Sequence, residues 1–440
     1  MDTGTLLQYW LPIVVFGLVF AGVLLELTEK SLITAIGALV LILVHSVEQH
    51  EALAMIDFDT LTLLFGMMIV VEVAAHARLF EWLSMLILRM TKGRPLLIFV
   101  LFIVNTLVLS SFLNNVTTIL IMLPLTIEIA KGIGLNLRPF VIGEMVAANI
   151  GGLLTLIGDP VNTIVGTAAD LGMMSFMVNL STPVFIIAGA TIAFLWLTDR
   201  KSFAGIRSNF TKVLHNLLVL KNVEGRFRAT PFDKTLLCIA IACLICTIGG
   251  FIAAEYLDIS PGLVAVIGAT VTMVATHHRV PYSTIVGGIE WQTLLFFGGL
   301  FVVVGAVEQT GILEQVAEHL VALTAQPAAL LAIILVSTGI ISAIVDNVPF
   351  VTLMIPIITS IQEEQIFPDG SVLWWALCLG AVMGGMASPY GSSANIVAVG
   401  TARKAGYKLS NATYMLYSLP ISVGGLAVSY VYLVFAYLRP

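Results

Sequence analysis

The stretch SSFLNNVTTILIMLP, residues 110–124, sets six polar side chains inside a long apolar run. The polar residues are Ser110, Ser111, Asn114, Asn115, Thr117 and Thr118. Polar groups in a hydrocarbon environment are costly unless they have partners, and the proline that ends the stretch cannot continue an ideal helix. The stretch therefore predicts an interruption in an otherwise apolar helix.

The whole chain is too apolar for a soluble protein. Of its 440 residues, 59% are hydrophobic and 10% are charged, whereas soluble domains carry about 25% charged residues. The apolar runs are continuous and approach the roughly 20 residues of a spanning helix, unlike the alternating strands of a membrane β-barrel. We predict an all-α polytopic membrane protein that lies in the lipid bilayer.

The composition also argues against several other classes. The net charge of −6 does not favour nucleic acid as a partner. The four cysteines lie in apolar runs, and the pair Cys243 and Cys246 has no further zinc ligands nearby. No HExxH, GxSxG or P-loop pattern occurs. We therefore expect neither an enzyme nor a metal centre or cofactor.

One long polar stretch divides the chain. Residues 199–234 hold eight of the twenty Lys and Arg residues, and the positive-inside rule predicts that this connection is cytoplasmic. It separates residues 1–198 from residues 235–440, which we interpret as a first and a second repeat.

The two halves carry the same motifs in the same order. LLFGMMIVV at 63–71 matches LFFGGLFVV at 295–303, and the same spacing of 232 residues aligns residues 114–116 with residues 346–348. At a spacing of 233 the matched pairs are Gly151 with Gly384, Gly152 with Gly385, Gly158 with Gly391, and Asn162 with Asn395. Several matches at nearly one spacing indicate an internal repeat.

Equivalent connections differ in charge. Residues 78–94 carry four basic side chains, whereas the counterpart 308–326 carries three Glu and no Lys or Arg. The connections 131–138 and 362–370 differ in the same way, basic in the first half and acidic in the second. Repeats of inverted topology show this pattern. We expect a bacterial inner-membrane protein with its N-terminus outside and its central connection inside.

Each half contains two helix breaks. The first pair is LNNVTT at 113–118 and VDNVPF at 345–350, and the second is LIGDPVNTIVG at 156–166 and SPYGSSANIVAVG at 388–400. In secondary transporters with inverted repeats, the substrate lies where broken helices meet. Half-helix N-termini there present N–H groups to an anion or an oxygen-rich solute. The alternative, polar residues that only join packed helices, fits a single break better than four related ones.

Two carboxylates lie in these breaks. An acid inside the membrane is by default a proton relay or a cation ligand, and we assign proton coupling to Asp159 and Asp346. Asp346 aligns with Asn114, and Asp159 aligns with Ser392. Each pair of breaks therefore has one ionisable group, which allows proton or cation coupling.

Two further acids are weaker candidates. Glu72 lies four residues before His76, so a local pair on one helix face is its expected role. Glu144 follows Arg138 by six residues and is expected to lie too shallow for the core.

The segment from 110 to 166 resembles the first-repeat core of ArsB/NhaD-type permeases of the ion transporter superfamily. SAIVDNVPFVTLMIPI and GSSANIVAVGTARKAGYKLS resemble the second repeat, and the likeness covers nearly the whole chain. The chain looks closer to the P-protein-like branch than to the typical bacterial arsenite permease, which has an amide in place of Asp346. The resemblance implies scaffold helices, re-entrant hairpins at 95–131 and 327–361, a broken helix in each half, a homodimer and an elevator mechanism. It carries substrate- and ion-binding roles to Asn114, Asn115, Thr117, Asp159, Asn162, Asp346, Asn347, Ser392, Ser393 and Asn395.

We predict a secondary active transporter. The first hypothesis for its function is efflux of arsenite or antimonite coupled to the proton gradient. A pocket of amides, hydroxyls and helix ends suits a small neutral trihydroxide. Sodium–proton antiport is the alternative, because Asp, Asn and Ser oxygens can surround Na⁺ without a permanent metal site. Sodium-coupled transport of an organic di-acid, or an anion channel, ranks lower because no Lys or Arg is expected near the breaks.

Overall fold

The computed structural model describes residues 3–25, 27–91, 94–132, 134–200, 203, 233–324, 326–363, 366–367 and 369–438. Within these residues every regular element is a helix, and no strand occurs. The predicted all-α fold is confirmed. Most of the connection predicted at 199–234 lies outside the described residues.

Helices follow one another closely along the chain. The described part of the first half forms α1 (Thr3–Leu24), α2 (Lys30–Leu43), α3 (Gln49–Ala54), α4 (Phe58–His76), α5 (Leu79–Thr91), α6 (Pro95–Ser110), α7 (Asn115–Gly132), α8 (Leu137–Gly152), α9 (Pro160–Ala168) and α10 (Met173–Thr198). The described part of the second half forms α13 (Lys234–Leu257), α14 (Pro261–Thr276), α15 (Tyr282–Gly287), α16 (Trp291–Glu308), α17 (Ile312–Leu323), α18 (Pro327–Ile344), α19 (Asn347–Glu363), α20 (Ser371–Gly385), α21 (Ser393–Lys404) and α22 (Asn411–Tyr437).

Many of these helices have the length and apolarity of membrane spans. Among the described residues, seven helices qualify by length and composition: α4, α7, α10, α13, α16, α18 and α22. Shorter apolar helices are α2, α6, α14, α20 and residues Tyr9–Leu24 of α1. The chain is therefore an integral membrane protein, as its composition predicted.

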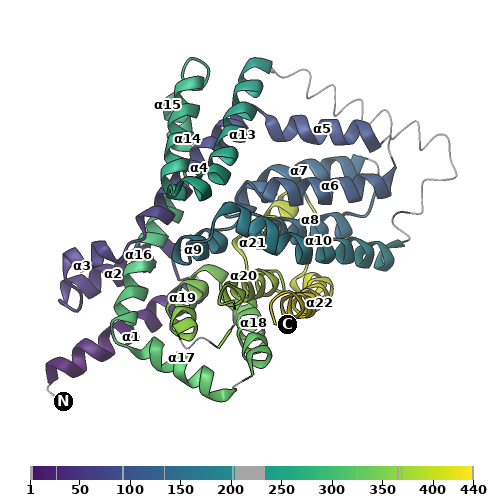
Figure 1. Ribbon diagram of the computed structural model, residues 1–440. Coiled ribbons are helices and arrows are strands. Elements are labelled where there is room, and N and C mark those ends of the chain that lie inside the picture. The colour runs from purple at the N-terminus through teal and green to yellow at the C-terminus, as the bar shows by residue number, and fades with distance from the viewer. Residues whose placement is uncertain are drawn as a thin grey trace.

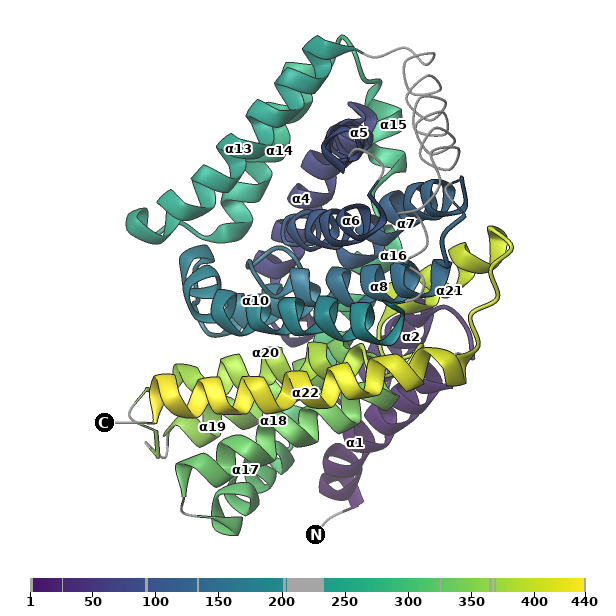
Figure 2. The ribbon, with the colours of Figure 1, turned by 90° about the vertical axis from the view of Figure 1, so that its right-hand side faces the viewer.

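The helices form groups that mix the two halves of the sequence. Figures 1 and 2 show α13 and α14 beside α4 at one end of the molecule, and α1 and α2 beside α16 near the N-terminus. Between these groups lie α6, α7, α8 and α10, stacked on α18, α20 and α22 (Figure 2). The broken helices are thus held between the two scaffold-like pairs, α4 with α14 and α2 with α16.

Glycine explains the close approach within both scaffold-like pairs. A Cβ atom on Gly66 of α4 would lie 2.5 Å from the Ala265 backbone of α14. A Cβ atom on Gly299 of α16 would lie 2.7 Å from the Thr34 backbone of α2. Small residues allow this backbone contact between membrane helices. The two glycines lie one position apart in the aligned motifs, since Gly66 aligns with Gly298 at the spacing of 232 residues.

All four predicted breaks separate helices in the structure. Residues 111–114 join α6 to α7, and residues 345–346 join α18 to α19. Residues 153–159 join α8 to the short α9, and residues 386–392 join α20 to α21. The sequence linked the first break to its proline, but Pro124 lies inside α7 and Pro356 inside α19. Each interruption therefore precedes its proline, at the Asn-rich turn.

The two halves make equivalent contacts around the breaks. A Cβ atom on Gly151 would lie 2.4 Å from the Leu107 carbonyl oxygen, and one on Gly384 would lie 2.1 Å from the Gly339 carbonyl oxygen. Both glycines and both partners are related by the repeat spacing. Helix α6 packs on α8 in the first half as α18 packs on α20 in the second.

Candidate functional site

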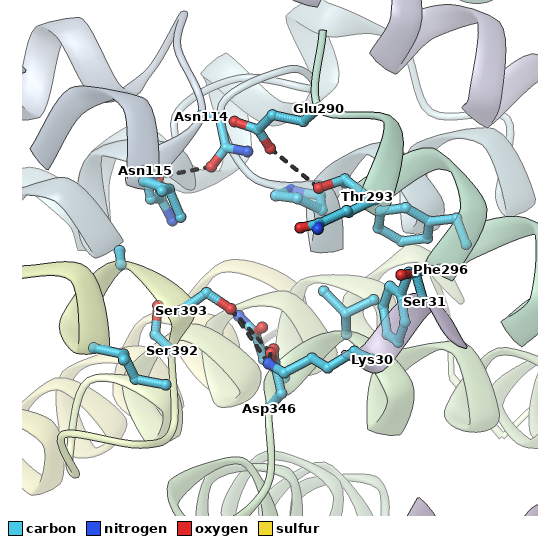
Figure 3. Close-up of a pocket in the computed structure, with 18 of the residues that line it drawn as sticks. Lys30, Ser31, Asn114, Asn115, Glu290, Thr293, Phe296, Asp346, Ser392 and Ser393 are labelled. Atoms are coloured by element: carbon cyan, nitrogen blue, oxygen red, sulfur yellow. Dashed lines mark hydrogen bonds and ion pairs between the residues drawn. The ribbon is translucent and has the colours of Figure 1, made fainter. Parts of the chain in front are cut away.

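Residues from all four breaks line one cavity of about 710 Å³. In Figure 3, Asn114, Asn115 and Glu290 lie on one face of this cavity, and Asp346 and Ser393 lie on the opposite face. Seven of the ten predicted site residues line it: Asn114, Asn115, Asp159, Asp346, Asn347, Ser392 and Ser393. The sequence therefore located most of the polar wall, drawn from segments more than 200 residues apart.

The first-half wall is a connected polar cluster. The side-chain amide of Asn115, the first residue of α7, donates a hydrogen bond to Asp159. Asp159 precedes α9, where its other oxygen accepts from the Val161 backbone N–H at 2.9 Å. Ser110 Oγ lies 2.7 Å from Asn115 Oδ1. Because Asp159 is only 2% exposed, Asn115 and the α9 N-terminus supply the polar contacts that a buried carboxyl group needs.

The second-half wall contains an ion pair that the sequence did not predict. The ammonium group of Lys30, the first residue of α2, bonds to Asp346 Oδ2. Ser393 Oγ, at the start of α21, donates to the same oxygen at 3.1 Å. The expectation that no Lys or Arg lies near the breaks is therefore wrong, because α2 brings Lys30 to the cavity from far along the chain.

Glu290 is a second cavity residue that the sequence did not predict. It directly precedes α16 and lines the cavity opposite Asp346 (Figure 3). Its carboxylate accepts from Thr293 Oγ1 at 3.1 Å and from Thr117 Oγ1 at 3.4 Å. Thr117, one of the predicted site residues, therefore contacts the cavity wall through Glu290 rather than lining the large cavity itself. Glu290 and Lys30 are both charged residues at the start of an apolar helix. This position was the sequence feature that could have indicated them.

Asn162 and Asn395 are fully buried and bond to the backbone of the breaks. Asn162 Nδ2 donates to the Gly152 and Thr155 carbonyl oxygens at 3.0 and 2.8 Å. Asn395 Nδ2 donates to the Gly385 and Ser388 carbonyl oxygens at 3.1 and 3.0 Å. These acceptors are the carbonyls that a broken helix leaves without partners. Neither Asn is among the residues that line the large cavity.

Four helices begin at the cavity wall. The first residues of α7, α9, α19 and α21 are Asn115, Pro160, Asn347 and Ser393, and all four line the cavity. A helix N-terminus carries free N–H groups and about half a positive charge. Together with Lys30, these ends favour a negatively charged or oxygen-rich solute.

The weaker acidic candidates lie elsewhere. The Glu72 carboxylate lies 3.3 Å from His76 Nδ1, the local pair that was expected, and Glu72 lines a small cavity of about 60 Å³. Glu144 is fully buried and accepts a hydrogen bond from Thr126. Its expected shallow position is wrong because α8 is enclosed by α6, α7 and α10. Among the described residues, no group of three or more His, Cys, Asp or Glu side chains is placed to hold a metal ion.

A helical membrane protein whose broken helices enclose a polar cavity has the architecture of a secondary transporter. Residues 20–380 match the profile of the citrate transporter family, CitMHS, and the chain belongs to this family of the ion transporter superfamily. It is a transporter and not an enzyme, as predicted.

Several curated relatives are similar to this chain in sequence, and two solved structures are similar to it in fold. The chain is 35% identical over 389 residues, 87% of either chain, to the "Uncharacterized transporter Rv2685" of Mycobacterium tuberculosis. It is 26% identical to the P protein of Sus scrofa, covering 98% of this chain and 60% of that protein. The fold is similar to the YdaH transporter of Alcanivorax borkumensis, with a TM-score of 0.57, 16% identity and 99% of both chains covered. It is also similar to MtrF of Neisseria gonorrhoeae, with a TM-score of 0.57 and 13% identity over 91% of this chain and 84% of that one.

Proposed function

We propose that this chain is a secondary active transporter of a small organic carboxylate such as citrate, bound in the large cavity. The observation that carries the proposal is that Lys30 and four helix N-termini line one cavity. The Lys30 ammonium group offers a charge-assisted hydrogen bond to a carboxylate, and the helix ends offer backbone N–H groups. The name of the family supports the same class of substrate.

The acidic residues of the cavity supply the coupling in this proposal. Asp159, Asp346 and Glu290 line the same cavity as Lys30, so fixed carboxylates outnumber the fixed cation. An anion binds there favourably only when protons or cations neutralise some of these carboxylates. Binding of the anion and of the coupling ion are therefore linked. Asp159 and Asp346 remain the residues that we assign to proton coupling.

We also propose that the halves are inverted repeats, each with a scaffold part and a transport part. The equivalent glycine contacts at the breaks support the same local structure in both halves. The opposite charge of equivalent connections supports an inverted orientation of the two halves. In this arrangement the N-terminus is outside and the central connection is cytoplasmic. Homologues from mycobacteria support an inner-membrane location. A homodimer with elevator motion stays part of the proposal.

A second candidate is proton-coupled efflux of arsenite or antimonite. The uncharged polar groups of Asn115, Asn347 and Ser392 at the cavity favour this reading, since arsenite is mostly a neutral trihydroxide at neutral pH. Sodium–proton antiport is a third, favoured by the contact between Asn115 and Asp159, whose oxygens suit a hard cation.

Ligand-induced stabilisation of the purified protein separates these candidates. A ligand that binds only the folded state at 100 times its dissociation constant stabilises it by about 2.7 kcal/mol. We expect citrate to raise the apparent melting temperature of the wild type in detergent at fixed ionic strength, and Lys30→Met to lose most of this increase. An increase with arsenite or Na⁺ and none with citrate would favour the second or third candidate.

A further inference from the structure

A second cavity of about 270 Å³ adjoins the large one. Both cavities are lined by Lys30 and Asp346. The remaining wall of the smaller cavity comes from the C-terminal end of α1, from Ile344 at the end of α18, and from Tyr390 in the break before α21. Ile344 and Tyr390 are 62% and 56% exposed, so the smaller cavity lies at the surface of the molecule.

The Lys30–Asp346 ion pair is therefore shared by the large cavity and this surface cavity. Asp346 also accepts from Ser393 Oγ at 3.1 Å, and Lys30 Nζ lies 3.4 Å from the same hydroxyl. The Lys30 and Asp346 side chains are 29% and 11% exposed. A partly buried pair of this kind is less screened by salt than a surface pair.

The pair also joins two groups of helices. Lys30 begins α2, which packs on α1, α3 and α16. Asp346 lies between α18 and α19, which pack on α20, and Ser393 begins α21, which packs on α7 and α8. Relative movement of these groups must stretch or break the ion pair, because Lys30 sits on one group and Asp346 on the other.

We propose that the Lys30–Asp346 ion pair is a gate between the two cavities, which the anionic substrate opens by replacing Asp346 as the partner of Lys30. The replacement is an exchange of one carboxylate for another at the same ammonium group. It leaves Asp346 without its cationic partner, so Asp346 is then free to take up a proton or another cation. The opening step rests on the carboxylate substrate proposed above, whereas the separation of the cavities by the pair does not.

Cysteine accessibility tests the gate in a background whose four native cysteines are replaced by alanine. Gln292→Cys reports on the large cavity, and Ile344→Cys reports on the small one, because each residue lines its cavity and is exposed. A membrane-impermeant thiol reagent is applied to right-side-out or inside-out vesicles. With the pair intact, we expect Gln292→Cys to react from one side only.

Removing the pair by Lys30→Met with Asp346→Leu should let the Gln292→Cys reporter react from both sides. The exchanged pair, Lys30→Asp with Asp346→Lys, is the matched control and should restore one-sided reaction. It also shows that the effect depends on the pair rather than on correct folding alone. The gate would be overturned if Gln292→Cys still reacted from one side only after the pair is removed, while Ile344→Cys remained reactive.

Citrate provides the second arm of the experiment. With the pair intact, citrate should raise the reaction rate of Gln292→Cys from the closed side about tenfold, the ratio for a coupling free energy of about 1.4 kcal/mol. Sidedness that depends on the pair but does not respond to citrate would overturn opening by a carboxylate and count against the proposed substrate. The separation of the cavities by the ion pair would stand in that case.

Discussion

Asn149 Nδ2 donates a hydrogen bond of 2.9 Å to Asn395 Oδ1, and both side chains are buried. The bond joins α8 of the first half to α21 of the second, next to the breaks that line the cavity. Because Asn395 also donates to the Gly385 and Ser388 carbonyls, one amide stabilises its own break and the contact between halves. A buried hydrogen bond therefore joins the two halves next to the cavity.

Replacing Asn395 by alanine should destabilise the protein strongly. The change leaves two carbonyls and the Asn149 amide without this partner in a buried place, and we expect a loss of about 2–4 kcal/mol. The measurement is the apparent melting temperature of the purified protein in detergent. Asn411→Ala is the control, because Asn411 is exposed and its side chain donates a hydrogen bond to the Tyr390 hydroxyl. Equal effects of the two changes would contradict the structural role of Asn395.

Two adjacent glycines of α16 should respond oppositely to alanine. At Gly299 the new Cβ would lie 2.7 Å from the Thr34 backbone, so α2 and α16 must separate, at a cost of about 1–3 kcal/mol. At Gly298 nothing lies within 4 Å, and alanine should be neutral or stabilise the helix by up to about 1 kcal/mol. Melting temperatures and expression of the two variants provide the comparison. A similar loss for both would show that α2 and α16 do not pack as described.

The sequence predicted the features that local pattern controls. Continuous apolar runs predict helices in a membrane, and polar residues and glycines at corresponding positions of the two halves mark the breaks. The fold class and the breaks followed from these patterns, and the family resemblance then supplied the seven cavity residues. Lys30 and Glu290 were missed because their roles depend on the packing of α2 and α16. A charged residue at the start of a span has the same local pattern whether it faces water or a cavity. Asn162 was predicted as a ligand because an amide side chain can bind a solute. In the structure its amide group donates hydrogen bonds to backbone carbonyls instead.

Lys30→Met should weaken substrate binding with little effect on folding. Loss of one charge-assisted hydrogen bond costs about 1.5–3 kcal/mol, which corresponds to an increase in KM of about 10- to 100-fold. Lys408→Met is the control, since Lys408 is exposed in the connection after α21. Initial rates of citrate uptake over a range of concentrations measure the effect. An unchanged KM for Lys30→Met would exclude Lys30 as a ligand.

Asp159→Asn should uncouple substrate movement from the proton gradient. The substituted amide cannot take up and release a proton, so accumulation of substrate against a gradient should be lost, while exchange of internal for external substrate should remain. Comparing gradient-driven uptake with counterflow in the same proteoliposomes gives this difference. Asp170→Asn is a suitable control, because Asp170 lies outside the cavity and has a φ of 52°, which Asn tolerates. Intact accumulation in Asp159→Asn would remove Asp159 from the coupling mechanism.

Uptake of labelled citrate by the purified protein in liposomes, under an imposed proton gradient, tests the central claim most directly. Arsenite flux and sodium-driven proton movement are measured in the same preparation. The account predicts citrate accumulation that depends on the gradient and is lost in Lys30→Met but not in Lys408→Met. Arsenite flux or sodium-driven proton movement without any citrate uptake would contradict it.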